Sequence, residues 1–409
     1  MSGSVRRADT ESPNPFIRYR WLLRCYRRAI GQGWTDAEFI SRVEQLDEAV
    51  RTVDGRGFAI TPLTREPNLA AALGVSADRL WVKDDTGNVG ESHKGRHLFG
   101  VLLDLAVDDT DDRELAIASC GNAAVAAAIV ARAAGRKLRV FIPTWADPAV
   151  TERLRELDAR MEVAPRRESE VGDPTVHRML EAVAGGAIPF SAQGTFTPST
   201  LDGGRTIGWE LAEQLALARV SGRVHVICQV GGGALATCVW QGLNDGLAEH
   251  WLTAEPVLHT VQTEAVAPLN RAWRRLLGWA AEHLDETEEW SDERIDAVME
   301  EARRVPGEFM WPWETVGSSA ATGILDDVTY DWLPLVDAML RSRGQAHVLA
   351  EEVVLRGNHL ARRHTTIPVD ATGSAGVGAL LDPGFRSEVG PEDNVVVFFT
   401  GGDRTVRQA

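Results

Sequence analysis

Short apolar segments alternate with helical segments from residue 114 onward, and this alternation limits the possible folds more than any other feature of the sequence. Runs of β-branched and apolar residues predict strands, and the alanine- and leucine-rich runs between them predict helices. Strands joined by helices form βαβ units, so we expect a parallel sheet with helices on both faces. The predicted order is strand 114–119, helix 122–134, strand 138–143, helix 149–159 and strand 161–164.

The alternation is less regular on either side of this region. The first dozen residues are polar and are expected to be disordered, and apolar side chains at three- and four-residue steps predict helices over 15–53. A short strand is expected at 79–84, a crossover between lobes at 190–204 and a helix at 206–218. Further strands are expected at 224–230 and 394–399, separated by an acidic, tryptophan-rich excursion over 273–313 that includes Glu286–Trp290.

Composition excludes several classes of function. The formal net charge of −16 disfavours binding to nucleic acid or to anionic membranes, which are themselves negative. No apolar run is long enough to span a bilayer, and the N-terminus lacks the apolar stretch of a signal peptide. The four cysteines show no CxxC spacing, so we expect neither disulfides nor a metal site, and a cytoplasmic location.

Lysine is rare in this chain, which contains only Lys83, Lys94 and Lys137. Lys94 ends a polar, glycine-containing segment between a predicted strand and a predicted helix. Glycines let the backbone turn sharply before a helix, and an amine at a helix start is disfavoured as a cation. Such a lysine is a candidate for covalent chemistry, although a solvated surface lysine is the commoner reading of any single position.

Three more polar segments follow predicted strands. Ser119-Cys120-Gly121-Asn122 opens a helix and can bind an anion through backbone amides, unless Asn122 is simply the N-cap. Gly231, Gly232 and Gly233 precede Ala234 and another helix, which suits a phosphate nest or a tight packing turn. Thr400 offers a hydroxyl to a ring nitrogen, or merely caps its strand. In open α/β sheets, ligands bind at the carboxyl ends of strands, where all these segments are expected.

Taken together, these segments resemble the fold-type II pyridoxal-phosphate (PLP) enzymes, which include threonine synthase, threonine dehydratase, cysteine synthase and the tryptophan synthase β chain. Their Asn-Pro-Thr-Gly-Ser-Phe-Lys segment aligns with Asn88–Lys94, and their Ser-Gly-Asn loop with Cys120–Asn122. Residues 204–215 resemble a helix common in threonine synthases. The resemblance runs from about Thr61 to Arg404.

The resemblance implies a fold and a cofactor. It implies an α/β protein of two lobes, each a mostly parallel sheet flanked by helices, with PLP in the cleft between them. The implied division is a helical N-terminal extension at 1–60, a large cofactor-binding domain at 61–92 and 201–409, and a smaller mobile domain at 93–200. A homodimer is also implied.

The resemblance assigns roles to individual residues. Lys94 would form the internal aldimine with PLP and shuttle the Cα proton. Asn122 would hold the 3′ oxygen of the cofactor, and Thr400 would meet its ring nitrogen. The substrate carboxylate would bind at Ser119, Cys120, Gly121 and Asn122, and the 5′ phosphate at Gly231, Gly232, Gly233 and Ala234.

The segment around Lys94 departs from the family pattern. Val89, Gly90 and Glu91 replace Pro-Thr-Gly, His93 replaces Phe, and Gly95 stands where Asp often follows the lysine. Cys120 stands where Ser or Thr is common. These changes bear on the substrate rather than on the cofactor.

The reaction that the resemblance implies is a β/γ-elimination or replacement on an amino acid with a side-chain leaving group. Threonine synthase activity on phosphohomoserine is an alternative. Two competing classes stay open: a non-catalytic α/β ligand-binding protein with a degenerate PLP pocket, and a nucleotide-binding Rossmann protein.

Overall fold

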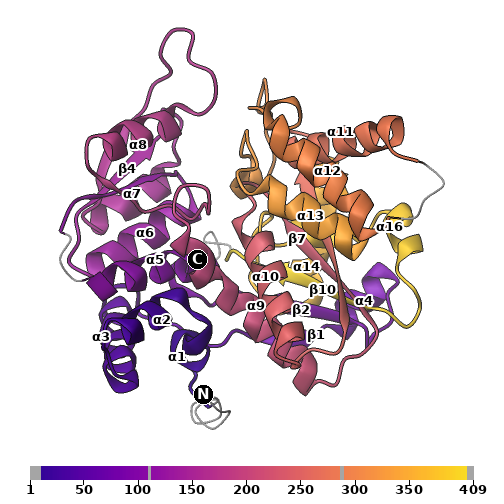
Figure 1. The fold of residues 1–409 in the computed structure, drawn as a ribbon, viewed down its shortest axis with the longest axis horizontal. Coiled ribbons are helices and arrows are strands. Elements are labelled where there is room, and N and C mark those ends of the chain that lie inside the picture. The colour runs from indigo at the N-terminus through magenta and orange to yellow at the C-terminus, as the bar shows by residue number, and fades with distance from the viewer. Residues whose placement is uncertain (1–10, 109–111, 286–289, 403–409) are drawn as a thin grey trace. The chain divides into compact units, whose positions relative to one another are not determined.

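The computed structural model describes residues 11–108, 112–285 and 290–402. These described residues form two compact units, one within the ranges 1–61 and 87–210 and the other within 62–86 and 211–409. Each unit contains one sheet (Figure 1). The disorder expected for the first dozen residues falls mainly on residues 1–10, which lie outside the described part.

The first unit contains a four-stranded sheet in the order β5-β4-β3-β6, in which every pair is parallel. Its strands are β3 (Leu115–Ala118), β4 (Leu138–Ile142), β5 (Arg160–Val163) and β6 (Ile188–Pro189). The helices between them are α6 (Asn122–Ala133), α7 (Pro148–Glu156) and α8 (Pro174–Ala184). The alternation predicted for 114–164 is therefore confirmed, with boundaries that differ by a few residues.

Other helices of the first unit precede β3 in the chain. They are α1 (Pro15–Arg18), η2 (Arg20–Leu22), α2 (Arg24–Gly31), α3 (Asp36–Asp54), η3 (Val89–Glu91) and α5 (Lys94–Asp108). The N-terminus of α3 is well defined, because Thr35 and Glu38 form a reciprocal capping box. The long helix α9 (Ser199–Leu217) begins in this unit and continues past its last residue.

Helix α9 begins seven residues earlier than the sequence predicts, so part of the expected crossover is helical. Its first turns contain Gly203 and Gly204, which the sequence pattern assigns to a loop. The reason is close packing against α5. A Cβ at Gly100 would lie 2.5 Å from the Cα of Gly203, and a Cβ at Gly203 would lie 2.2 Å from the carbonyl oxygen of Arg96. Glycine is used here for helix contact rather than for a turn.

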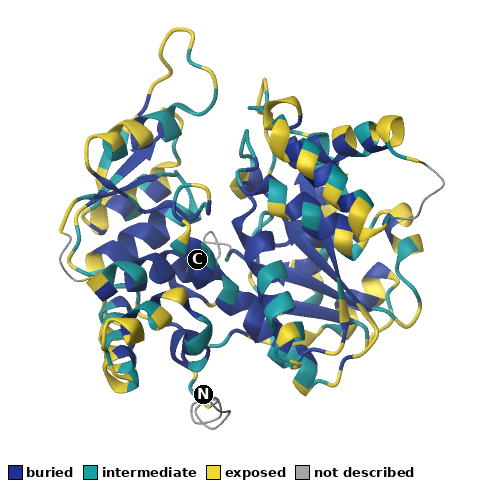
Figure 2. Ribbon diagram, viewed as in Figure 1, coloured by how far each residue is buried: buried dark blue, intermediate teal, exposed yellow. Residues whose placement is uncertain are grey.

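The second unit contains a six-stranded sheet in the order β1-β2-β10-β7-β8-β9, parallel except for the β1–β2 pair. The strands are β1 (Leu63–Arg65), β2 (Leu80–Asp84), β7 (Arg223–Gln229), β8 (Glu255–Thr263), β9 (Ala346–Leu349) and β10 (Asn394–Phe399). β10 and most of β7 and β8 are buried, as the dark strands of Figure 2 show. Such continuous buried strands are typical of parallel sheets covered on both faces.

The remaining helices belong to the second unit. They are α4 (Pro67–Leu73), α10 (Ala234–Ala248), α11 (Pro268–His283), α12 (Asp292–Arg304), η4 (Pro306–Glu308), η5 (Thr322–Ile324), α13 (Trp332–Ser342), α14 (Glu351–His364), α15 (Ala375–Ala379) and α16 (Pro383–Glu388). The tryptophan-rich excursion contains α12 and most of α11, within the connection between β8 and β9. Residues 286–289 of that excursion lie outside the described ones. Within the described residues, no helix has the length and apolar character needed to cross a membrane.

Candidate active site

Lys94 opens helix α5, and the turn before it is built from two left-handed residues. Gly90 has φ 69° and Glu91 has φ 60°, so the chain reverses sharply just before the lysine. Asp54 accepts a hydrogen bond from the Gly90 amide (3.1 Å), and Arg56 pairs with Glu91 (3.4 Å). The ion pair stabilises an unusual backbone conformation, which gives Glu91 a structural role. The predicted bend before the helix is confirmed.

Gly95, directly after the lysine, leaves no space for a side chain. A Cβ at this position would lie 2.6 Å from the carbonyl oxygen of Val89. The backbone of the turn therefore packs directly on the start of α5. This contact gives a physical reason for glycine at a position where the resembling family often has Asp.

Arg96 holds the start of α5 in the interior of the first unit. Its guanidinium is fully buried and forms an ion pair with Glu210 of α9 (2.7 Å), which is also fully buried. It donates further hydrogen bonds to Asn88 (2.7 Å) and Thr206 (3.0 Å). Glu210 also accepts from the amide and the hydroxyl of Thr61 (3.0 and 2.9 Å). Burying a charge pair is tolerated only with such additional hydrogen bonds.

His97 lies one helical turn after Lys94 and is fully buried. Burial, together with the nearby charge of Lys94, lowers the pKa of His97 to about 3. Its Nδ1 lies 3.2 Å from the carbonyl oxygen of Thr200. Since a carbonyl only accepts, Nδ1 carries the proton and Nε2 keeps its lone pair. A neutral histidine therefore lies close to the lysine at all physiological pH values.

The loop Ser119–Gly121 connects β3 to α6. The N-cap of α6 is Gly121 and its first residue is Asn122, so the alternative in which Asn122 caps the helix is wrong. Gly121 has no side chain, and its amide donates to the Ser119 hydroxyl (3.4 Å). The first amides of α6 have no partner within the helix, as at every helix start. The loop can therefore present backbone donors to a carboxylate.

The glycine turn of the second unit connects β7 to α10. Gly231, Gly232 and Gly233 are all buried, and Gly233 is the N-cap of α10 with φ 102°. Two backbone carbonyls of the turn are fixed by the segment after η5. The Thr329 hydroxyl donates to the Gly231 carbonyl (2.9 Å), and the Asp331 amide donates to the Gly232 carbonyl (2.9 Å). With its carbonyls held in this way, the turn has a defined direction for its amides.

Asp326 lies against the first glycine of the turn. A Cβ at Gly231 would be 2.3 Å from the Oδ2 of Asp326 and 3.1 Å from the Cα of Ile324. Only glycine fits there while Asp326 stays in place. Asp326 also adds negative charge beside a turn that we expect to bind a phosphate.

Thr400 follows β10 and is 2% exposed. Gln229, the last residue of the neighbouring strand β7, donates from Nε2 to the Thr400 hydroxyl (2.7 Å) and to the Gly373 carbonyl (2.8 Å). A Cβ at Gly373 would lie 2.7 Å from the Gly401 amide nitrogen, so the segment after Thr400 packs on bare backbone. Thr400 and the glycine turn therefore both lie at the carboxyl edge of one sheet.

The predicted site residues fall into two groups. Lys94 and Ser119–Asn122 belong to the first unit, and Gly231–Ala234 and Thr400 belong to the second. The other two lysines are placed differently. Lys83 is buried on β2 with its amine donating to Gln214 (3.0 Å), and Lys137 is exposed in the loop before β4.

The sequence pattern assigns no role to Arg96, Gln229, Thr329 or Gly373. Each of them helps to position a predicted site residue, and none of them belongs to a recognisable sequence motif. Gln229 had one usable signal, because a polar side chain ending a buried strand needs a partner.

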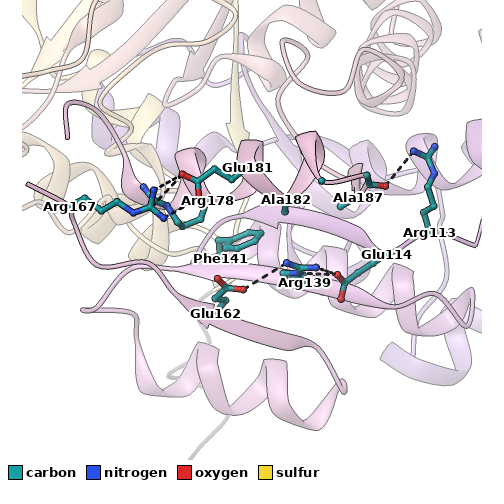
Figure 3. A pocket seen from close by; sticks show the side chains of 12 residues that line it. Arg113, Glu114, Arg139, Phe141, Glu162, Arg167, Arg178, Glu181, Ala182 and Ala187 are labelled. Carbon is teal, nitrogen blue, oxygen red and sulfur yellow. Dashed lines mark hydrogen bonds and ion pairs between the residues drawn. The ribbon is translucent and has the colours of Figure 1, made fainter. Parts of the chain in front are cut away.

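A cavity of about 540 Å³ in the first unit is lined by none of these residues (Figure 3). Its lining includes Glu114 and Ala187, the residues just before β3 and β6, whereas Ser119–Asn122 lies at the carboxyl end of β3. Four of its charged residues form ion pairs, Arg139 with Glu114 and Arg167 with Glu181 (2.6 Å). Figure 3 shows Phe141 between these two pairs. The cavity therefore does not belong to the candidate site.

Comparisons with known proteins agree with this arrangement. The chain resembles the solved structure of maize serine racemase over 90% of its own length and 95% of that chain, with 14% identity and a TM-score of 0.61. It resembles the processed form of threonine deaminase isoform 2 from Solanum lycopersicum over 92% of both chains, with 16% identity and a TM-score of 0.62. Diaminopropionate ammonia lyase from Escherichia coli matches over 90% of both chains, with 17% identity and a TM-score of 0.62.

These likenesses show the fold alone, because sequence identities this low carry no information about the reaction. No curated protein matches the sequence. The family model described as "Pyridoxal-phosphate dependent enzyme" matches residues 56–401, which is most of the chain. The expected α/β fold with two mostly parallel sheets is confirmed. The chain therefore belongs to the pyridoxal-phosphate dependent enzymes of fold type II, whose cofactor is PLP.

Proposed function

We propose that this enzyme eliminates or replaces a leaving group at the β or γ carbon of an amino acid, with Lys94 as the residue that binds PLP covalently. PLP, when bound, supplies an electron sink for the negative charge that develops at Cα. The residues of this chain would bind the amino acid, orient it and move its protons. The observation that carries the proposal is the neutral hydroxyl of Thr400 at the carboxyl end of β10, held by the amide of Gln229.

The donors of the second unit are suited to PLP. The first amides of α10 follow a buried glycine turn whose carbonyls are fixed by Thr329 and Asp331. A phosphate binds well to such amides and to the positive end of the helix dipole. Asp326 acts against phosphate binding and must be outweighed by these donors. Thr400 provides the hydroxyl for the ring nitrogen.

The residues of the first unit are suited to the amino acid and to proton transfer. Lys94 would take the Cα proton and return it, a role for which its fixed position at the start of α5 is favourable. Neutral His97 adds no second positive charge beside the amine. The amides of Ser119–Asn122 would bind the substrate carboxylate, and Asn122 would donate to the phenolic oxygen of the cofactor.

The neutral hydroxyl at Thr400 favours elimination. A carboxylate at the ring nitrogen would keep that nitrogen protonated and the ring a strong electron sink. A neutral hydroxyl there would leave the ring a weaker sink, which would favour loss of a leaving group from the substrate over storage of the negative charge in the ring. The weaker sink therefore supports elimination or replacement over transamination.

One experiment tests the covalent assignment. The holoenzyme is reduced with borohydride and digested, and the modified peptide is identified by mass. We expect the label on Lys94, with none on Lys83 or Lys137. A label on another lysine, or a colourless protein that takes up no PLP, would overturn the proposal, and the second result would favour a ligand-binding protein with a degenerate pocket.

A spectral screen identifies the substrate. Amino acids and their O-acyl and O-phospho derivatives are added to the holoenzyme, and absorbance, ammonia and keto acid are measured. We expect release of ammonia or transfer to a nucleophile with one class of derivative. Formation of the D-enantiomer without loss of the side-chain group would indicate a racemase instead, which is the activity of the maize protein whose structure this chain resembles.

The threonine synthase alternative has one structural observation to account for. The segment 204–215, which resembles threonine synthases, lies in α9 and contains Thr206 and Glu210. Both side chains hold Arg96. The segment therefore has a structural use that does not depend on a phosphorylated substrate, and activity in the O-phospho arm of the screen is needed to support phosphohomoserine.

A further inference from the structure

Gln229 and Thr400 form a contact whose direction can be deduced. The amide nitrogen of Gln229 lies 2.8 Å from the Gly373 carbonyl oxygen and 2.7 Å from the Thr400 hydroxyl oxygen. A carbonyl only accepts hydrogen bonds, so the atom facing Gly373 must be the nitrogen and not the oxygen of the amide. The orientation of the side chain is therefore set by chemistry and not by an arbitrary choice.

The hydroxyl of Thr400 must then accept from Gln229. Nε2 carries two protons, one for Gly373 and one for Thr400, and it has no lone pair to offer. The single hydroxyl proton of Thr400 is consequently not used in this contact and points elsewhere. Both side chains are nearly fully buried, at 5% and 2% exposure, so water does not easily replace the arrangement.

The rest of the Gln229 side chain is consistent with this role. No donor among the described residues reaches its Oε1, which lies 3.6 Å from where a Cβ on Gly376 would be. Leaving a buried amide oxygen without a partner costs free energy, and such a cost is expected where a side chain is held for function. That distance is an ordinary van der Waals contact, so the surroundings accept the amide without strain.

We propose that Gln229 is a positioning residue that fixes the Thr400 hydroxyl as a hydrogen-bond donor toward the ring nitrogen of PLP. An unprotonated ring nitrogen can accept this bond, whereas a protonated one would face a second donor. Gln229 thus keeps the ring nitrogen unprotonated and selects the weaker electron sink. The inference depends on the proposed placement of the ring nitrogen at Thr400.

The sharpest test reverses the direction of the bond. In Gln229→Glu the oxygen at this position can accept from Thr400 whether the carboxyl is ionised, or protonated and donating to Gly373. Thr400 then offers a lone pair to the ring, which favours a protonated nitrogen. We expect the ratio of protonated to unprotonated ring nitrogen to rise at least about tenfold at constant pH, because one hydrogen bond changes sign.

The readout is the ¹⁵N resonance of PLP labelled at the ring nitrogen, in the holoenzyme without substrate. The matched control is Gln262→Glu, since Gln262 is a buried glutamine on the adjacent strand β8 whose Nε2 contacts the Val230 carbonyl (3.3 Å) and the Thr329 hydroxyl (3.4 Å). We expect its ring resonance to match that of the wild type. A protonated ring nitrogen in the wild type would overturn the inference.

A second variant covers the possibility that Gln229→Glu does not fold. Gln229→Met keeps the volume and removes the donor, so the hydroxyl loses its fixed direction and the resonance should move part of the way. An unchanged resonance in every Gln229 variant that folds, with PLP still trapped on Lys94, would overturn the role of Gln229 alone. A failure to trap PLP on Lys94 in the wild type would instead overturn the proposed function.

Discussion

The two units hold their site residues by different means. In the first unit the start of α5 depends on a buried ion pair, Arg96 with Glu210. In the second unit the glycine turn and Thr400 depend on neutral hydrogen bonds from Thr329 and Gln229. A buried charge loses most when its single counter-charge is removed, whereas the loss of one neutral hydrogen bond is smaller. We therefore expect substitutions at the ion pair of the first unit mainly to lower the free energy of unfolding. Substitutions at the hydrogen bonds of the second unit should mainly change cofactor binding.

The largest expected effect is that of Lys94→Arg. Arginine keeps the positive charge at the start of α5 but cannot bind PLP covalently, so activity should fall by roughly 10²- to 10⁴-fold. Borohydride trapping and steady-state kinetics measure the loss. Lys137→Arg is the matched control, because Lys137 is exposed in a loop of the same unit. If Lys94→Arg retained activity, Lys94 would not be the reactive residue of the first unit, and the comparison of how the two units hold their site residues would fail.

Next in size is Glu210→Gln. This change leaves the Arg96 guanidinium buried without its counter-charge, and we expect the free energy of unfolding to fall by about 3–5 kcal/mol. Urea denaturation of the holoenzyme measures it. Glu152→Gln is the control, since Glu152 and Arg155 form an exposed pair on α7. The double variant Arg96→Met/Glu210→Leu should recover much of the loss, and if it does not, the ion pair is not the cause.

Gly231→Ala tests the second unit at the glycine turn. The added Cβ meets Asp326, so the turn should shift and PLP should bind about tenfold more weakly, with little change in folding. Fluorescence titration of the apoenzyme with PLP measures the affinity. Combining it with Asp326→Ala removes both the obstacle and a like charge. Affinity that stays low in the double variant would show that the turn needs glycine for another reason.

The last prediction involves a change of pH and not a single substitution, because the stability of the second unit should depend on pH. His225, His259 and His347 lie on adjacent strands and connect to each other at 3.0 and 3.3 Å, and His225 also contacts Asp393. Burial lowers the pKa of all three below the usual 6.5. Their neutral forms are favoured in the fold, so this stability is complete above about pH 6.5 and is lost as pH falls below it.

The size of this loss is up to about 1.4 kcal/mol per histidine for each pH unit below 6.5. Urea denaturation between pH 8 and pH 5 measures it, and His259→Gln should flatten the dependence. His97 adds a similar contribution in the first unit, because its pKa is also depressed. A stability that rises toward pH 5 would contradict the assignment of neutral histidines.

Much of the fold could be predicted from periodicity, and the exceptions have physical causes. Strands β3 and β4 could be found because they are mostly buried, and buried parallel strands are nearly continuous apolar runs. The start of α9 could not, because glycines such as Gly203 and Gly204 are typical of turns, and only the three-dimensional contact with Gly100 explains Gly203 in a helix. Strand β8 was not predicted, since its histidine and threonine side chains obscure its apolar pattern.

The candidate site divides in the same way. Lys94, Ser119–Asn122, Gly231–Ala234 and Thr400 could be predicted, because chemistry at strand ends needs particular residue types in sequence. Arg96 and Gln229 could not be assigned, because each acts through a partner more than 100 positions away, as the bonds to Thr206 and Thr400 illustrate. Their importance depends on contacts that no local pattern contains.

The contact between Gly100 and Gly203 has a mechanical consequence for the lysine. At this contact the backbones of α5 and α9 touch directly, and larger side chains flank the contact. Helix α5 could therefore slide along α9 only after moving away from it, over those side chains. Lys94 lies in the same helix, six residues before Gly100. The position of the Lys94 amine along the axis of α5 therefore depends on two glycines, Gly100 and Gly203, each of which has a hydrogen atom in place of a side chain.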